Sequence, residues 1–175
     1  QEAVQVIIPA FLEGGRYTID DVHYLAENEN LIPVSDTQFA KDVVFGYQNA
    51  NLKKWVEEKS KGKIKASDVV SISIDDLRTK TPEIVAKRLQ KIDAKQVCIV
   101  NAAGYKDLEV FALSVILSER KFVFRSSATF VPISAGLVSS KPFIPQAKEN
   151  SSKNGSLIMV GSHVPKSTLQ LNYLL

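Results

Sequence analysis

The sequence predicts an α/β fold built on a mostly parallel sheet, and two observations lead to this prediction. From residue 69 onward, short apolar runs of strand length alternate with segments whose apolar residues recur at helical spacing. In addition, 45% of the 175 residues are hydrophobic, which is enough to fill a core and argues against a disordered chain. Strand–helix alternation is typical of a Rossmann-like sheet flanked by helices. The length corresponds to about one domain.

The first part of the chain predicts one strand of this sheet and then a small β-hairpin insertion. Val4–Ile8 is a mostly apolar run that ends at Pro9, as expected of a buried strand leading into a loop. Gly14 and Gly15 follow and permit unusual backbone angles. The hairpin is predicted from extended segments at residues 17–19, 22–25 and 31–34, with a turn at residues 27–30.

The rest of the chain predicts alternating helices and strands. Leu52–Lys59 is expected to be helical with Asn49 or Asn51 as its N-cap, and a second helix opens at Thr81, with its hydroxyl as the cap and Pro82 in the first turn. The helix that opens at Thr81 keeps its apolar spacing through residues 84–92. The predicted strands cover residues 69–74, 96–100, 121–124 and 157–160, and the remaining helices cover residues 107–120, 126–137 and 167–175. Residues 139–156, rich in Ser, Lys, Pro and Asn, are the expected place for a domain boundary.

Two single residues carry expectations about burial. Leu113 lies in the middle of the strongly apolar helix at residues 107–120, so it is expected to belong to the core. Cys98, the only cysteine, lies in a predicted apolar strand, so a buried residue is expected rather than a reactive thiol.

Composition excludes several classes of protein. The 22 Lys and Arg residues outnumber the 19 Asp and Glu residues by only three and are spread evenly, so no nucleic-acid partner is expected. No apolar run approaches the roughly 20 residues that cross a bilayer, so no membrane span is expected. Gln1 and Glu2 lead directly into the first strand without a basic and apolar leader, and a cytoplasmic location is expected.

Residues at the carboxyl ends of the predicted strands are the first candidates for function, because ligands of parallel α/β sheets bind there. They are residues 14–16, Asp75, Asp76, Arg78, residues 101–104, residues 125–127 and residues 161–163. The arginines and small hydroxyl residues among them suit an anionic ligand, because a guanidinium offers a planar fork of donors to a carboxylate or phosphate. For any one of these arginines, a structural ion pair is the equal alternative.

The sequence gives less support to a carboxylate pair, a metal site, a standard nucleotide-binding motif or a hydrolase active site. Asp75 and Asp76 are adjacent, so a loop cap or turn is expected rather than a catalytic pair. Neither His23 nor His163 has neighbours at metal-ligand spacing, and no metal site is predicted. The phosphate-binding Gly-x4-Gly-Lys-Ser/Thr pattern, the Gly-x-Gly-x-x-Gly fingerprint and the Gly-x-Ser-x-Gly elbow of α/β hydrolases are absent.

Six segments, in order along the chain, resemble the four-carbon acid sugar kinase family. They are Pro-Ala-Phe-Leu-Glu-Gly-Gly-Arg-Tyr-Thr at residues 9–18 with Val-His-Tyr at 22–24, Thr-Gln-Phe-Ala-Lys-Asp at 37–42, Gly-Tyr at 46–47 with Trp-Val-Glu-Glu-Lys at 55–59, Asp-Leu-Glu-Val at 107–110, Phe-Arg-Ser-Ser-Ala-Thr-Phe-Val at 124–131, and Gly-Ser-His-Val-Pro-Lys-Ser-Thr at 161–168. Leu12 replaces a proline of the first motif, and Asn101 stands where many members have Asp.

The resemblance implies a two-domain, ATP-dependent kinase of four-carbon sugar acids such as threonate or erythronate. Residues 1–160 are similar to the later part of its N-terminal sugar-acid-binding domain, and residues 161–175 to the junction toward a C-terminal nucleotide-binding domain. The family's Asp-Asp-x-Thr-Gly-Ala and Asp-Ser-Thr-Leu-Arg-Gly motifs are not among the 175 residues, so these residues alone are expected to be inactive.

The resemblance also implies roles for individual residues. Gly15, Arg16 and Arg125 are the expected substrate-binding residues, with a structural salt bridge as the alternative for Arg16. Gly161, Ser162 and Lys166 are the expected nucleotide-binding residues, with a plain helix N-cap as the alternative for Ser162. The implied cofactor is ATP with magnesium, and no catalytic residue or metal ligand is assigned. Assembly into a homo-oligomer stays open, and the alternative function is a non-catalytic α/β small-anion-binding or scaffold module.

Overall fold

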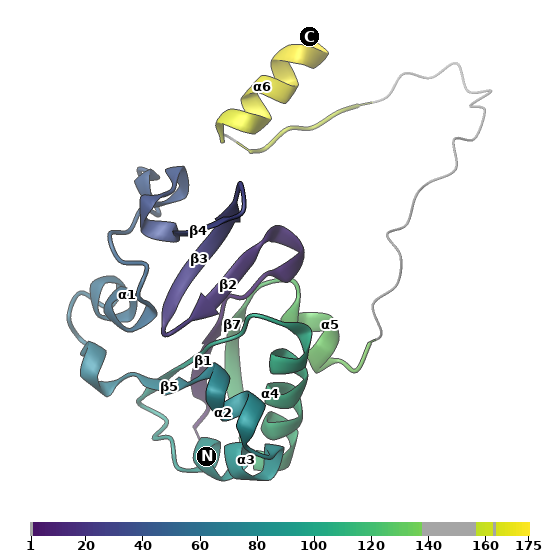
Figure 1. Ribbon diagram of the computed structural model, residues 1–175. Coiled ribbons are helices and arrows are strands. Elements are labelled where there is room, and N and C mark those ends of the chain that lie inside the picture. The colour runs from purple at the N-terminus through teal and green to yellow at the C-terminus, as the bar shows by residue number, and fades with distance from the viewer. Residues whose placement is uncertain (1, 138–156, 163) are drawn as a thin grey trace. The chain divides into compact units, whose positions relative to one another are not determined.

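A four-stranded parallel sheet forms the centre of the fold, as the sequence predicts. The computed structural model describes residues 2–137, 157–162 and 164–175. The strands are β1 (Val4–Ile8), β5 (Val70–Ile72), β6 (Val97–Val100) and β7 (Phe122–Ser126), in the spatial order β5-β6-β1-β7 (Figure 1). All neighbouring strands pair in parallel, with Val6 of β1 opposite both Cys98 and Phe124.

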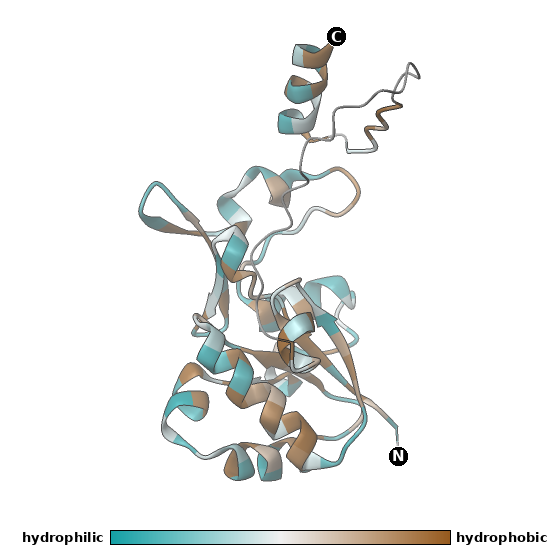
Figure 2. Cartoon of the chain, turned by 90° about the vertical axis from the view of Figure 1, so that its right-hand side faces the viewer, coloured by the Kyte–Doolittle hydropathy of each residue, from teal (hydrophilic) through white to brown (hydrophobic). Residues whose placement is uncertain are grey.

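Helices cover both faces of this sheet because its strands are apolar on both sides. Val97 and Ile99 of β6 pack with Val56 of α1 (Leu52–Lys59), whereas the alternate residues Cys98 and Val100 belong to the larger core on the opposite face. That larger core also holds α2 (Ile74–Thr79), α3 (Pro82–Gln90), α4 (Tyr105–Ser118) and α5 (Phe130–Ser134). Figure 2 shows hydrophobic residues concentrated along the parallel strands and their helices.

The predicted hairpin insertion is a small antiparallel sheet of three strands. Its strands are β2 (Arg16–Ile19), β3 (Val22–Glu27) and β4 (Asn30–Pro33). Two-residue turns join them, at Asp20-Asp21 and at Asn28-Glu29, and all four turn residues have positive φ. Such turns match the right-handed twist of paired strands, and Asn and Asp tolerate this conformation better than most residues.

Several boundaries differ from the predictions. The strand predicted at residues 69–74 ends at Ile72, because Ser73 caps α2 and exchanges hydrogen bonds with Asp76 in a capping box. The helix predicted at residues 126–137 is reduced to α5, because β1 pairs with β7 as far as Ser126. Thr81 is the N-cap of α3, but its side chain makes no cap hydrogen bond. Asn51, one of the two residues proposed, caps α1 by accepting a hydrogen bond from the Lys54 amide.

The expectation that Leu113 is buried is wrong. The side chain of Leu113 is 46% exposed, whereas Leu108 and Phe111 of the same helix are fully buried. The core covers only one side of α4, and Leu113 lies outside the buried stripe. Cys98, in contrast, is fully buried as predicted, and burial raises the pKa of its thiol to about 12.

Residues 141–175 form the C-terminal unit of the chain. Its helix α6 (Pro165–Leu174) begins two residues before the predicted start. The strand predicted at residues 157–160 is wrong: these residues are exposed and form no strand. An apolar run becomes a strand only where another strand pairs with it, and no strand of the described residues does so. The predicted domain boundary at residues 139–156 lies outside the described residues. No helix in the described part of the chain is long and apolar enough to cross a membrane.

Candidate functional site

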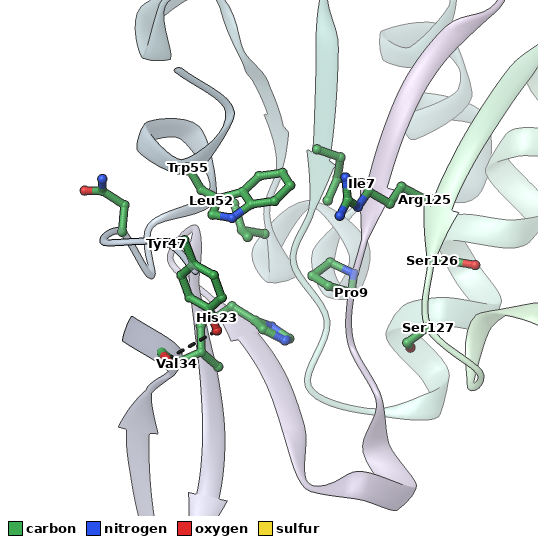
Figure 3. Close-up of a pocket in the computed structure, with 11 residues that line it drawn as sticks. Ile7, Pro9, His23, Val34, Tyr47, Leu52, Trp55, Arg125, Ser126 and Ser127 are labelled. Atoms are coloured by element: carbon green, nitrogen blue, oxygen red, sulfur yellow. Dashed lines mark hydrogen bonds between the residues drawn. The ribbon is translucent and has the colours of Figure 1, made fainter. Parts of the chain in front are cut away.

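A cavity of about 230 Å³ lies at the carboxyl ends of β1 and β7, where a parallel sheet is expected to bind its ligand (Figure 3). The sheet contributes residues at the ends of β1 and β7, α1 contributes two side chains, and β3 and the segment before α1 close the other side. The lining residues are Ile7, Pro9, His23, Val34, Tyr47, Asn49, Leu52, Trp55, Arg125, Ser126 and Ser127.

Arg125 is the cation of this cavity. Its place follows from the pairing of β7 with β1, which sets Arg125 beside Ile7. The guanidinium lies over the ring of Trp55, 4.8 Å from its centroid. Within the described residues, the side chain of Arg125 makes no hydrogen bond or ion pair. Stacking therefore orients the guanidinium while its N–H donors stay available to a ligand.

Arg16, the other predicted arginine, lies on the small sheet and not in the cavity wall. It is the first residue of β2, and its guanidinium lies 4.9 Å from the centroid of the Phe39 ring. No hydrogen-bond or ion-pair partner of its side chain is found in the part of the chain that the structure describes. Gly15 before it has a φ of +64°, the left-handed region, and its carbonyl accepts a 2.7 Å hydrogen bond from the Ala26 amide.

The other three arginines of the chain are committed to structural contacts. Arg78 forms a two-pronged ion pair with Asp107, with distances of 2.8 and 2.9 Å. Arg88 pairs with Asp76, and Arg120 donates to backbone carbonyls before β6. These three arginines therefore have structural contacts, whereas the side chains of Arg16 and Arg125 make no hydrogen bond or ion pair with any described residue.

His23 contributes a neutral imidazole to the cavity wall. It is 8% exposed, and its Nδ1 lies 3.0 Å from the Thr18 hydroxyl. Burial, and then the positive charge of Arg16, lower the pKa of His23 to about 4. The imidazole is therefore uncharged near neutral pH, so it does not repel the cation of Arg125.

The hydroxyl groups around the cavity fall into two kinds. Tyr47 donates to the Val34 carbonyl at 3.3 Å, and Ser127 donates to the Ala10 carbonyl, so both are held by the protein. The hydroxyl of Ser126 has no such partner within residues 2–137, which hold the cavity. Ser126 and Arg125 are adjacent in β7, so their side chains point to opposite faces of the sheet, and the Ser126 hydroxyl points away from the guanidinium of Arg125 (Figure 3).

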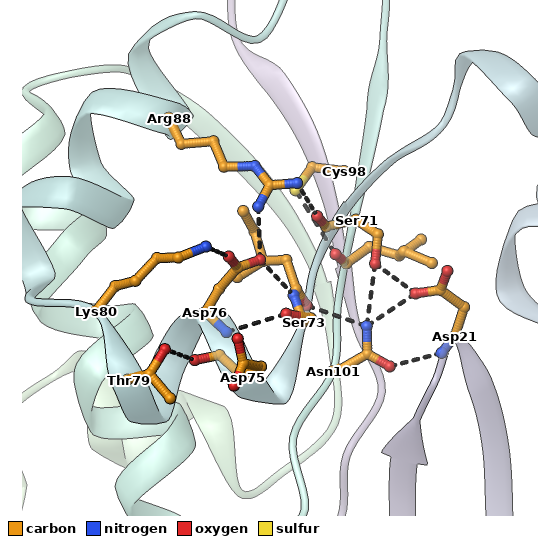
Figure 4. A network of polar contacts seen from close by, with 12 residues as sticks. Asp21, Ser71, Ser73, Asp75, Asp76, Thr79, Lys80, Arg88, Cys98 and Asn101 are labelled. Carbon is orange, nitrogen blue, oxygen red and sulfur yellow. Dashed lines mark hydrogen bonds and ion pairs between the residues drawn. The ribbon is translucent and has the colours of Figure 1, made fainter.

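A polar cluster that the sequence analysis did not find holds the small sheet in place (Figure 4). The Asn101 amide, at the end of β6, donates to the Asp21 carboxylate at 2.9 Å and accepts from the Asp21 amide at 2.7 Å. Ser71 and Lys53 also bind the Asp21 carboxylate. Burial acts to raise the pKa of the Asp21 carboxyl, but these hydrogen bonds and the Lys53 charge together hold it below its ordinary value.

The cluster thus joins the β2–β3 turn to the carboxyl ends of β5 and β6. Backbone hydrogen bonds of 3.0 Å in both directions between Thr18 and Ala102 reinforce the joint. In the sequence, the position of Asn101 directly after a predicted strand was the feature that could have indicated this cluster. Asp75 and Asp76 belong to the start of α2, and Asp76 serves in its capping box, as the cap interpretation predicted.

The predicted nucleotide-binding residues belong to the C-terminal unit. Gly161 and Ser162 are exposed before α6, and Lys166 is exposed in its first turn. His163 lies outside the described residues. The described residues contain no group of three or more His, Cys, Asp or Glu that could hold a metal ion.

Comparisons with known proteins support the fold and identify the family. The family model of the sugar-binding N-terminal domain matches residues 1–133. A crystal structure of a Haemophilus influenzae protein of family DUF1537 superposes on 77% of the chain with a TM-score of 0.61 and 19% identity. A Bordetella bronchiseptica DUF1537 structure, a domain-swapped dimer with bound citrate, superposes on 77% with a TM-score of 0.56 and 21% identity. The chain spans about three tenths of the length of these proteins. No curated protein matches it.

The fold and the site define the class of the protein as an α/β domain with a cavity at the carboxyl ends of its parallel strands. Because the family model matches 133 residues of the 175, the chain belongs to the family of sugar-binding N-terminal domains. The resemblance to four-carbon acid sugar kinases, inferred from the six motifs, is confirmed.

Proposed function

We propose that the cavity binds a four-carbon sugar acid of the threonate or erythronate type, with Arg125 holding its carboxylate. The observation that carries this proposal is the uncommitted guanidinium of Arg125, oriented over Trp55 within the cavity wall. A guanidinium of this kind binds a carboxylate through two parallel N–H donors. The lining residues of the described chain include no Asp or Glu that would compete for it.

Size and polarity support the same class of ligand. The cavity of about 230 Å³ is smaller than the roughly 300–1,000 Å³ that drug-sized ligands occupy. Asn49 and His23 offer polar groups for sugar hydroxyls. Ile7, Pro9 and Trp55 give the carbon chain an apolar wall. The citrate bound to the Bordetella protein is also a small hydroxy acid.

The catalytic part of the proposal concerns the complete protein. The family resemblance favours an ATP-dependent kinase in which Gly161, Ser162 and Lys166 contact the nucleotide and Arg16, next to the permissive Gly15, faces the sugar acid. Phosphoryl transfer depends mainly on positioning and on neutralising charge around the moving phosphate, which suits a domain whose role is to hold the acceptor acid. The alternative is a binding module without catalysis.

Removing the Arg125 guanidinium is expected to weaken threonate binding about ten- to a hundredfold, because a charge-assisted hydrogen bond contributes about 1.5–3 kcal/mol. Titration calorimetry compares the wild-type chain with Arg125→Gln and Arg125→Lys. Arg125→Lys keeps the charge without the planar fork, so its affinity should lie between the other two. Lys87→Gln removes an exposed charge from α3 and is the matched control.

Threitol, which has the same carbon frame without a carboxylate, should bind too weakly to detect. Equal threonate affinity in Arg125→Gln and the wild type, with both variants folded, would contradict the assignment. The kinase step is tested by release of ADP from ATP and magnesium in the presence of threonate, with the 175-residue chain expected to be inactive. Binding of threonate without ADP release by the longest encoded form of the protein would favour the binding module.

A further inference from the structure

Two cations act on the cavity, although only one of them lines it. Arg16 and Arg125 are the arginines without a structural partner among the described residues, and each is stacked on an aromatic ring, Phe39 and Trp55 respectively. Stacking holds a guanidinium in place without neutralising its charge. Both guanidinium charges are therefore available to a negatively charged ligand.

The small sheet turns Arg16 toward the same side as the cavity residue His23. Side chains alternate along a strand, so Arg16 and Thr18 of β2 lie on one face. Thr18 is paired with His23 of β3 on that face, and their side chains are joined by the 3.0 Å hydrogen bond. His23 in turn lines the cavity with Arg125. The Arg16–Leu25 pair is therefore next to the Thr18–His23 pair on the same face of the small sheet, and His23 belongs to the cavity wall.

The electrostatic effect of Arg16 on its neighbours agrees with this placement. The charge of Arg16 is felt at both His23 and Tyr47, where it acts to lower the pKa of each group, second to burial in both cases. Both of these residues line the cavity. Since the cavity wall has no carboxylate among its described residues, the positive potential of Arg16 and Arg125 is not offset inside it.

A ligand with one negative charge neutralises only one of these two cations. We infer that the cavity is selective for acids that carry two negative groups on a four-carbon frame, one facing Arg125 and the other on the side of Arg16. This inference rests on the proposed function and names its ligand class more narrowly. Either a second carboxylate or a phosphate group on the sugar acid supplies the second charge; the latter is what phosphorylation of the acid would produce.

A series of ligands with the same carbon number tests the inference. Titration calorimetry compares threitol, threonate, tartrate and threonate 4-phosphate, which differ in the number and kind of their negative groups. We expect at least one of the two doubly charged acids to bind the wild-type chain tenfold or more tighter than threonate. The preference should shrink as salt rises from 0.05 to 0.5 M, because salt screens the charges.

The Arg16→Gln variant identifies the source of this preference. In Arg16→Gln, the affinity for the doubly charged acids should fall to about the affinity for threonate. Arg16→Lys keeps the charge, so it should keep part of the preference for the doubly charged acids. Arg125→Gln, in contrast, should weaken all the acids, and Lys87→Gln should change neither property. Thermal unfolding of each variant establishes that it is folded.

The outcomes separate this inference from the proposed function. If threonate binds in an Arg125-dependent way but neither doubly charged acid binds tighter, or if the preference persists in Arg16→Gln, the inference is wrong and the proposed function stands. If no acid binds the folded chain, both are wrong. A preference for tartrate identifies the second group as a carboxylate, and a preference for threonate 4-phosphate alone identifies it as a phosphate.

Discussion

Replacing Leu108 by alanine is expected to lower the free energy of unfolding by about 2–5 kcal/mol, as for other fully buried leucines. Leu108 is 0% exposed and lies on the side of α4 that packs into the main core with Val6 and Phe111. Removal of its side chain loses both the burial of apolar atoms and the contacts of the surrounding residues, because a close-packed core collapses only partly into the cavity.

The same replacement at Leu113 is the matched control, because it removes the same atoms from the same helix. Leu113 is 46% exposed, so its loss should cost less than about half as much as the loss of Leu108. Urea unfolding followed by circular dichroism measures both variants against the wild type. Equal losses for the two variants would show that α4 does not turn Leu108 inward and Leu113 outward.

Between pH 6.5 and about 4, the chain is expected to lose up to roughly 3 kcal/mol of stability through His23 alone. Burial and the charge of Arg16 lower the pKa of His23 from 6.5 to about 4 in the folded chain. As the pH falls through this window, the unfolded chain takes up a proton at His23 before the folded chain does, so acid favours unfolding. Stability from this group is therefore complete above about pH 6.5 and is lost toward pH 4.

The measurement is urea unfolding at pH 7.0, 5.5 and 4.5 for the wild type and His23→Gln. The variant also loses the contact with Thr18, so the comparison concerns the slope of stability against pH and not its level. Asp76, whose pKa is lowered to about 2, contributes a similar loss at lower pH, below its ordinary value of 3.8. A wild-type slope equal to that of His23→Gln, or a His23 ring that titrates near 6.5 by NMR, would contradict the expected burial of the imidazole.

The sequence by itself determined the class of fold and most of its strands. Val4–Ile8 and the run around Cys98 are apolar at every position or nearly so, and such runs are stable only between two covered faces of a sheet. The turns of the small sheet are equally local, because Asp20-Asp21 and Asn28-Glu29 adopt the positive φ that two-residue turns require. The motifs with Arg16 and Arg125 also indicated the family before any geometry was known.

Tertiary structure decided what depends on partners far away in the chain. An apolar pattern does not tell which side of α4 meets the core, nor that residues 157–160 have no described strand to pair with. Asn101 binds Asp21, which is 80 residues away along the chain, and no local sequence pattern predicts this contact. The choice among the five arginines is of the same kind. Carboxylates or carbonyls of other elements engage three of them, whereas Arg16 and Arg125 have no such partner among the described residues, because an ion pair forms only where the fold brings opposite charges together.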